Sequence, residues 1–217
     1  MDIRQVYRQF QFRLNKLGTN ANQNFPLAQF VYLVNKAQLH WVESRAKVFE
    51  NDQSRTDELQ QILKDLKADP VKKDNYYKIP LPKDYLHPVR AVSSTKCGVI
   101  YIKPVEEGNV NALLQNEFTR PSAEWEETFY TIFGGELRAY VTDFTLGKID
   151  LKYLRKPVEV DIAGYIKADG SASGNIDLEF EGVNAQEIID LAVQIGSTDI
   201  GDLERYQTAT QQIQANP

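Results

Sequence analysis

The sequence has 217 residues, of which 42% are hydrophobic and 25% charged, close to the average of folded soluble proteins. A chain of this length buries roughly 70% of the surface that its unfolded form exposes, so we expect a core that needs neither metal nor disulfide. The one cysteine, Cys97, cannot form an internal disulfide, and neither His40 nor His87 has a second ligand at metal-site spacing. We therefore expect no cofactor and no bound metal. We expect neither a secretion signal nor a membrane span, because no stretch approaches the roughly 18 apolar residues that a span requires.

The net charge of −5 hides a gradient along the chain. Residues 1–50 hold seven Lys and Arg against three Asp and Glu, residues 51–167 hold 17 against 18, and residues 168–217 hold one against nine. One interpretation is two solvated helical faces of different sign. The other is that basic N-terminal and acidic C-terminal surfaces meet between neighbouring copies, where complementary charge selects partner and register.

Helices are predicted for residues 1–70. Apolar side chains at helical spacing begin at Ile3 and predict a first helix that ends at Gly18. A second helix is predicted from about Pro26 to Phe49, and the spacing of Leu59, Ile62, Leu63 and Leu66 predicts a third that stops before Pro70. We expect these segments to form a helical hairpin or small bundle.

A β-rich region is predicted for residues 71–183. Two β-prone runs, 128–133 and 136–141, are joined by Gly134-Gly135, which suits a two-residue hairpin turn with Ile132 opposite Leu137 and Phe129 opposite Tyr140. Strands are also predicted at 89–92, 97–102 and 149–153, and a single helical turn at 110–114.

C-terminal helices and a polar tail are predicted for residues 184–217. Asn184 and Glu187 have the spacing of a capping box at the start of a helix that ends before Gly196, and a last helix starts near Thr198. The fold class that we predict is α+β, with a helical hairpin or bundle, a mostly antiparallel β region and C-terminal helices, integrated into one domain.

Catalytic chemistry finds little support in the residues. Cys97 and His87 form a nucleophile and base only if the fold joins them, and Cys97 begins an apolar strand, where a buried thiol is the ordinary case. The carboxylates of Glu124, Glu126 and Glu127 are expected at a solvated strand entry. No phosphate-binding glycine motif occurs. Arg4, Arg8, Arg13 and Lys16 give a basic strip, which allows non-specific proximity to DNA.

Several short passages, in order along nearly the whole chain, resemble virion structural proteins of crAss-like bacteriophages and their relatives. These passages are Leu33-Val34-Asn35-Lys36-Ala37-Gln38, Val42-Glu43-Ser44-Arg45, residues 51–59, the Leu86 region, Asn116 with Arg120-Pro121-Ser122, Tyr153-Leu154-Arg155-Lys156-Pro157 and residues 184–192.

The resemblance implies a non-enzymatic ring or adaptor protein of the head–tail connector, portal-associated and a dodecamer, located in the virion. Its expected partners are copies of itself, the portal and neighbouring tail rings. The interface residues that we predict are Arg4, Arg8, Arg13, Glu204, Arg205 and Tyr206. Two alternatives stay open, a small hydrolase and a binding module for protein or nucleic acid.

Overall fold

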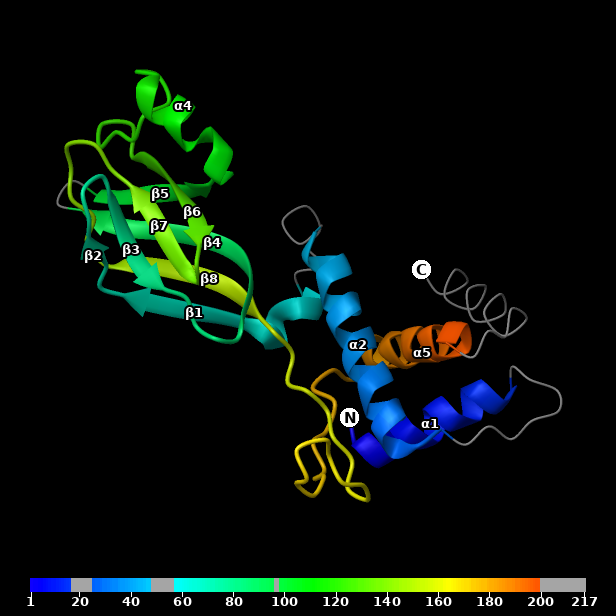
Figure 1. Cartoon of the computed structure of the whole chain (residues 1–217). Coiled ribbons are helices and arrows are strands. Elements are labelled where there is room, and N and C mark those ends of the chain that lie inside the picture. The colour runs from blue at the N-terminus through cyan, green and yellow to red at the C-terminus, as the bar shows by residue number, and fades with distance from the viewer. Residues whose placement is uncertain (17–24, 48–56, 96–97, 200–217) are drawn as a thin grey trace. The chain divides into compact units, whose positions relative to one another are not determined.

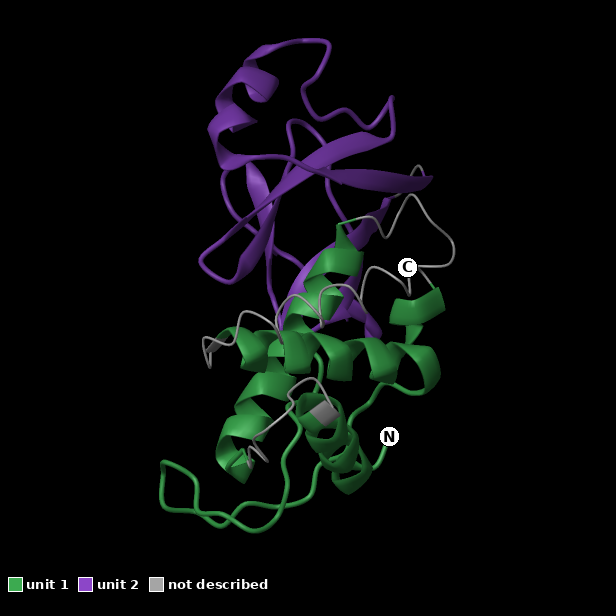
Figure 2. Ribbon diagram, turned by 90° about the vertical axis from the view of Figure 1, so that its right-hand side faces the viewer, with its two compact units in different colours: residues 1–61, 157–217 green, residues 62–156 purple. Residues whose placement is uncertain are grey.

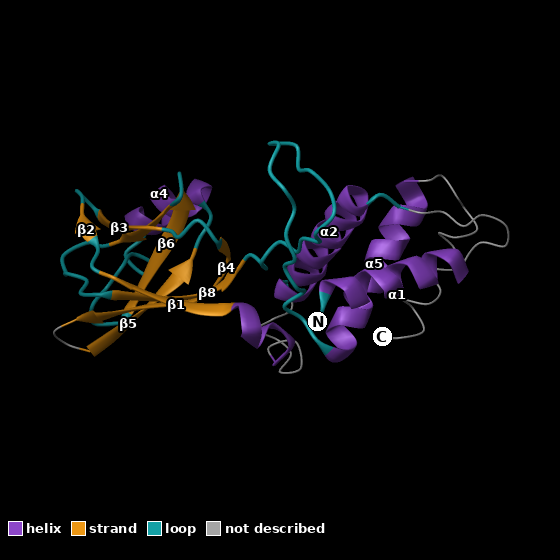
Figure 3. Cartoon of the chain, turned by 90° about the horizontal axis from the view of Figure 1, so that it is seen from below, coloured by secondary structure: helices purple, strands orange, loops and turns teal. Residues whose placement is uncertain are grey.

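The structure is a computed structural model that describes residues 1–16, 25–47, 57–95 and 98–199. The chain forms two compact units: the first combines residues 1–61 with 157–217, and the second holds residues 62–156 (Figure 2). The long helices belong to the first unit and the strands to the second (Figure 3). The chain is therefore α+β, as the sequence predicts.

Two helices precede the strands in the chain and one follows them, and the short α4 lies between β5 and β6 (Figure 1). The helices are α1 (Ile3–Lys16), α2 (Leu27–Ala46), α4 (Val110–Gln115) and α5 (Gly182–Asp199), with short 3-10 turns η1 (Gln60–Ile62) and η2 (Glu107–Asn109). The strands are β1 (Leu63–Ala68), β2 (Val71–Lys72), β3 (Tyr76–Pro80), β4 (Tyr85–Thr95), β5 (Gly98–Pro104), β6 (Glu127–Phe133), β7 (Glu136–Tyr140) and β8 (Ile149–Arg155).

The core of the first unit lies between α1, α2 and α5, and α5 packs against both other helices. The apolar face predicted for α1 is buried: Ile3, Val6, Phe10 and Leu14 are each at most 1% exposed. The helix begins where the carboxylate of Asp2 accepts the free backbone N–H groups of Arg4 (2.8 Å) and Gln5 (3.0 Å). The predicted first and second helices are thus confirmed, and their bounds of Gly18 and Phe49 lie outside the described residues.

Two polar side chains of α2 hold the extended segment 157–181. The amide of Asn35 accepts the backbone N–H of Val160 (2.8 Å) and donates to its carbonyl (3.1 Å). Gln38 donates to the carbonyl of Val158 at 3.0 Å. These side chains supply the bonds that a strand partner would otherwise provide, and the segment has only isolated β-bridges.

The prediction for α5 was wrong at both ends. The helix begins at Gly182 rather than Asn184, and Glu187 accepts hydrogen bonds from Trp41 Nε1 (2.7 Å) and from Arg45 of α2. It also continues through Gly196. A Cβ at this position would lie 3.1 Å from Leu33 Cδ1, so the glycine lets α5 approach α2 closely. The last predicted helix lies, from residue 200 onward, outside the described residues.

The second unit is an eight-stranded curled sheet in the order β1-β8-β4-β5-β6-β7-β3-β2. All neighbours are antiparallel except β5 and β6. The two end strands of the sheet, β1 and β2, are consecutive in sequence and joined by Asp69-Pro70 alone, so the sheet has to curl to bring its ends together (Figure 1). The enclosed face is filled by side chains that include Tyr77, Ile79, Ile100, Ile102, Tyr130, Leu137, Leu151 and Tyr153.

The third predicted helix was wrong over its second half, where Leu63–Ala68 is strand β1. The apolar residues of this segment have helical spacing, but in the structure Leu63 and Leu66 lie opposite Leu154 and Leu151 of β8. This pairing joins segments far apart in sequence, and it overrides the local helical pattern.

The hairpin between β6 and β7 is confirmed. Ile132 is paired with Leu137, and the rings of Phe129 and Tyr140 lie 5.3 Å apart between centroids. Gly134 and Gly135 have φ of 60° and 76°, the two positive values that a type I′ turn requires.

Candidate interaction site

The candidate site lies on the connection between β5 and β6, residues 105–126. Because these two strands are parallel, the chain has to run back along the full length of β5 before β6 can begin beside it. On the way it forms α4, whose Val110 packs on Phe129 and Tyr140, with Leu113 and Val105 beside them. The connection thus covers part of the outer sheet face and leaves a pocket at its edge.

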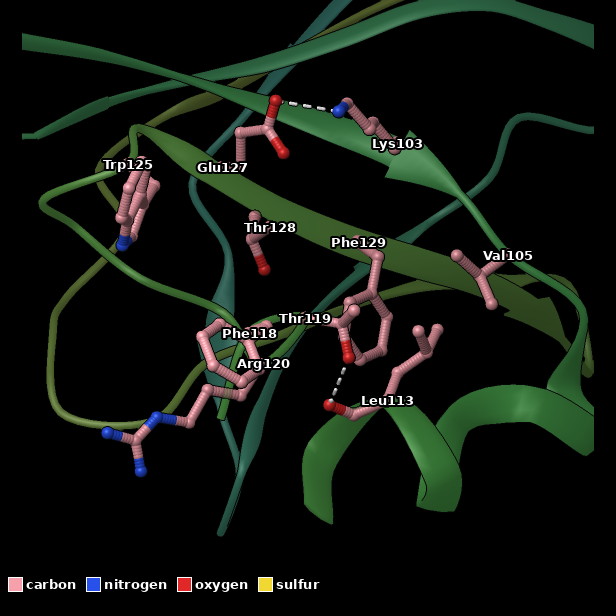
Figure 4. Close-up of a pocket in the computed structure, with 10 residues that line it drawn as sticks. All are labelled: Lys103, Val105, Leu113, Phe118, Thr119, Arg120, Trp125, Glu127, Thr128 and Phe129. Carbon is pink, nitrogen blue, oxygen red and sulfur yellow. Dashed lines mark hydrogen bonds and ion pairs between the residues drawn. The ribbon is translucent and has the colours of Figure 1, made fainter. Parts of the chain in front are cut away.

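The pocket has a volume of about 360 Å³ and is open to solvent. Its apolar floor consists of Val105, Leu113 and Phe129 (Figure 4). The remaining lining residues are Lys103, Phe118, Thr119, Arg120, Trp125, Glu127 and Thr128. An apolar cavity of roughly 150 Å³ accommodates a benzene ring, so this pocket has room for an aromatic side chain.

Two aromatic side chains at the pocket face the solvent. Phe118 is 98% exposed and Trp125 is 77% exposed. The backbone beside them is nonetheless hydrogen-bonded: Asn116 accepts the N–H groups of Phe118 (3.0 Å) and Arg120 (2.9 Å). At the other end Ser122 and Glu127 form an antiparallel bridge with bonds of 3.1 and 3.3 Å. The loop therefore holds two large apolar side chains in water, which is costly unless a partner covers them.

The rim of the pocket is acidic. The connection carries five glutamates and one arginine. Lys103 pairs with Glu127 at 2.6 Å and compensates that carboxylate. Glu117, Glu124 and Glu126 are exposed beside the aromatic pair, with Arg120 as the opposing charge. A partner that contacts this rim would gain from carrying basic groups.

The residue that precedes β6 has a strained backbone conformation. Glu126 has a φ of 52°, in the left-handed region that residues with a side chain rarely adopt, and its carbonyl accepts the N–H of Tyr101 at 3.0 Å. Strain of this kind clusters at functional sites. Here it turns the chain so that Trp125 faces the pocket and Glu127 enters the sheet.

The predicted interface residues lie elsewhere in the chain. Arg4 and Arg8 are exposed on α1. Arg13 instead joins α1 to α5 within the chain, through the carboxylate of Asp190 and, at 3.0 Å, the carbonyl of Gln186. The other three, Glu204, Arg205 and Tyr206, lie outside the described residues.

The three glutamates considered for acid–base catalysis lie at the pocket and its rim, whereas the other pair considered, Cys97 and His87, is not placed there by the described residues. Cys97 lies outside the described residues, and His87 is exposed on β4. Glu124, Glu126 and Glu127 are all exposed at the entry of β6, as predicted. Within the described ranges no group of three or more His, Cys, Asp or Glu side chains is placed to hold a metal ion.

Phe118 and Trp125 were not among the residues predicted from the sequence. A usable signal was present, because Trp125 stands among three glutamates and Phe118 between a glutamate and a threonine. Large aromatic residues in a polar loop indicate either a buried anchor or a binding surface. Their exposure in the structure excludes the buried anchor.

Comparison with protein families and with curated proteins found no match to this sequence. Over the part of the chain that the structure describes, no helix is long and apolar enough to cross a membrane.

Proposed function

We propose that this chain is a non-enzymatic structural subunit of a tailed-bacteriophage virion, assembled into a ring at the head–tail connector. The observation that carries the proposal is the pair of exposed aromatic side chains, Phe118 and Trp125, held on a hydrogen-bonded loop beside a pocket with an apolar floor and a polar rim. Aromatic residues around an apolar pocket are typical of the energetic centres of protein–protein interfaces.

The resemblance supports the same function. Of the passages that resemble crAss-like virion proteins, the one formed by Asn116 and Arg120-Pro121-Ser122 belongs to the loop that carries the aromatic pair. In a ring subunit this loop would contact a neighbouring copy, the portal or an adjacent tail ring. The expected copy number is twelve, which the resemblance implies.

Mass photometry and electron microscopy of the purified full chain, alone and with its portal protein, test the proposal. We expect closed rings under at least one of these conditions. A protein that stays monomeric in both would contradict it. The double variant Phe118→Ala/Trp125→Ala should retain the melting temperature of the wild type, because both side chains are exposed, and should assemble less.

A further inference from the structure

We infer that the pocket of one copy receives helix α1 of a second copy, with Phe12 as the inserted anchor and Arg4 and Arg8 on the acidic rim. This inference rests on the proposed function and names the two surfaces that would form the contact between neighbouring subunits.

The exposed face of α1 carries side chains at the spacing that insertion into a groove requires. Arg4, Arg8 and Phe12 follow one another at intervals of four residues, so they lie on one stripe of the helix, about 12 Å long. Phe12 is 69% exposed, although the opposite face of α1 is buried in the core. A helix that presents side chains at this spacing to an apolar groove is a recurrent mode of peptide recognition.

The charges of the two surfaces are complementary. Helix α1 contains no acidic residue, and Arg4 and Arg8 are exposed on its stripe, whereas Arg13 is paired with Asp190 of α5. The connection that forms the pocket contains five glutamates and one arginine. Opposite net charge on the two surfaces favours their encounter and sets the register of docking.

The pocket also suits the apolar side chain of Phe12. The pocket volume of about 360 Å³ exceeds what a phenyl ring requires, and its floor of Val105, Leu113 and Phe129 is apolar. Trp125 and Phe118 would pack against the ring of Phe12, and a guanidinium of the stripe would lie against the indole of Trp125 as a cation–π pair. Both surfaces are solvated in the single chain, so association removes apolar area from water on each side.

The two surfaces are different, so the contact is head-to-tail. Each copy then offers one stripe and one pocket, and successive copies form a ring where the rotation closes. A head-to-tail contact has a testable consequence: a copy that lacks a working stripe still offers its pocket, and a copy that lacks a working pocket still offers its stripe.

The experiment uses two full-length variants, the stripe variant Arg4→Glu/Arg8→Glu/Phe12→Ala and the pocket variant Phe118→Ala/Trp125→Ala. Mass photometry of each alone should show monomers, with the association constant lowered by at least roughly 30-fold, as expected for loss of an interface anchor. The equimolar mixture should show one-to-one dimers, because one intact contact remains between a wild-type pocket and a wild-type stripe.

Matched controls separate the contact from general effects. Tyr32→Ala removes another exposed aromatic side chain of the first unit, and Phe133→Ala removes one of the second. Arg4→Lys/Arg8→Lys keeps the charge of the stripe. All three should assemble like the wild type, and circular dichroism should show native helix content in every variant.

The outcomes distinguish this inference from the proposed function. Wild-type rings together with unaffected stripe and pocket variants would overturn the inference and leave the proposed function standing. A mixture that stays monomeric would exclude the head-to-tail contact. Wild-type protein that assembles only with the portal would overturn the self-contact, and protein that never assembles would overturn both proposals.

Discussion

Lys167 Nζ lies 2.8 Å from Oδ2 of Asp161, a carboxylate that is almost wholly buried in the first unit. The same carboxylate accepts the backbone N–H groups of Ile162 (3.0 Å) and Gly174 (3.0 Å) and the hydroxyl of Tyr165 (2.9 Å). One side chain thus fixes the two arms of the segment 157–181. Burial raises the pKa of Asp161, but the hydrogen bonds from Lys167, Gly174, Tyr165 and Ile162 outweigh it and lower the pKa from 3.8 to about 2.

The first prediction concerns acid stability. Because the pKa of Asp161 is lower in the folded chain than its ordinary 3.8, its contribution is complete above that pH and is lost as the pH falls toward 2. The expected contribution is on the order of 1–2 kcal/mol. Urea unfolding of wild type and Asp161→Asn from neutral to acid pH measures it. The difference in unfolding free energy should shrink below the ordinary pKa, and a constant difference would contradict this account.

The second prediction concerns the hairpin turn of the curled sheet. Gly134→Val and Gly135→Val should each destabilise the second unit by about 1–2 kcal/mol, because a β-branched residue is strained at positive φ. Gly134→Asn is the matched control, since asparagine tolerates this conformation and Asn-Gly is favoured in such turns. Urea denaturation monitored by circular dichroism is the measurement. Equal midpoints for the valine and asparagine variants would refute the argument.

This turn also shows what sequence reasoning can reach. Gly134-Gly135 between β-prone runs determines a hairpin locally, so its register was predictable. Leu63–Ala68 carried a helical pattern, and its strand conformation depends on pairing with β8, about ninety residues later in the chain. The α+β class and helices α1 and α2 followed from periodicity, because each amphipathic face is a local property.

The candidate site depends almost entirely on long-range pairing. Trp125 faces the pocket because β5 and β6 are parallel neighbours and Glu126 adopts a positive φ. Neither fact is encoded in a short motif. The basic character of α1 was predictable from Arg4, Arg8 and Arg13, but the division of these arginines between solvent and the ion pair with Asp190 required the packing of α1 on α5.

The third prediction compares the stability effects of replacing the ion-paired Arg13 and the exposed Arg8. Burial raises the pKa of Asp190, and Arg13 opposes that effect as its ion-pair partner. Arg13→Met removes the partner and leaves a partly buried carboxylate uncompensated, so it should destabilise the chain by about 1–3 kcal/mol at neutral pH. Arg8→Met changes an exposed position and should stay within about 0.5 kcal/mol of wild type.

The sign of the pH dependence provides a check on Arg13. Loss of the guanidinium should raise the pKa of Asp190 further above its ordinary value, so the carboxyl becomes neutral at a higher pH than in the wild type. The stability deficit of Arg13→Met should then be largest at neutral pH and decrease as the pH falls. Arg13→Met/Asp190→Asn should recover part of the loss at neutral pH. A deficit that is independent of pH would indicate lost packing instead.

The last prediction uses the two tryptophans as reporters of the candidate site. Trp41 is 2% exposed and donates to Glu187 in the core of the first unit, whereas Trp125 is 77% exposed at the pocket. Trp41→Phe leaves Trp125 as the single indole, and the lost hydrogen bond to a carboxylate together with the smaller buried ring should cost about 2–4 kcal/mol, so circular dichroism has to show that the variant is folded. In dilute solution its emission should be that of a solvated indole and should be quenched readily by acrylamide. As concentration drives assembly, the emission should shift to shorter wavelength and the quenching should fall, because apolar groups of a neighbour replace water around Trp125. Trp125→Phe, which reports Trp41 alone, should show no such change at any concentration. If Trp125 stays equally accessible in assembled protein, the pocket lies outside the subunit contact.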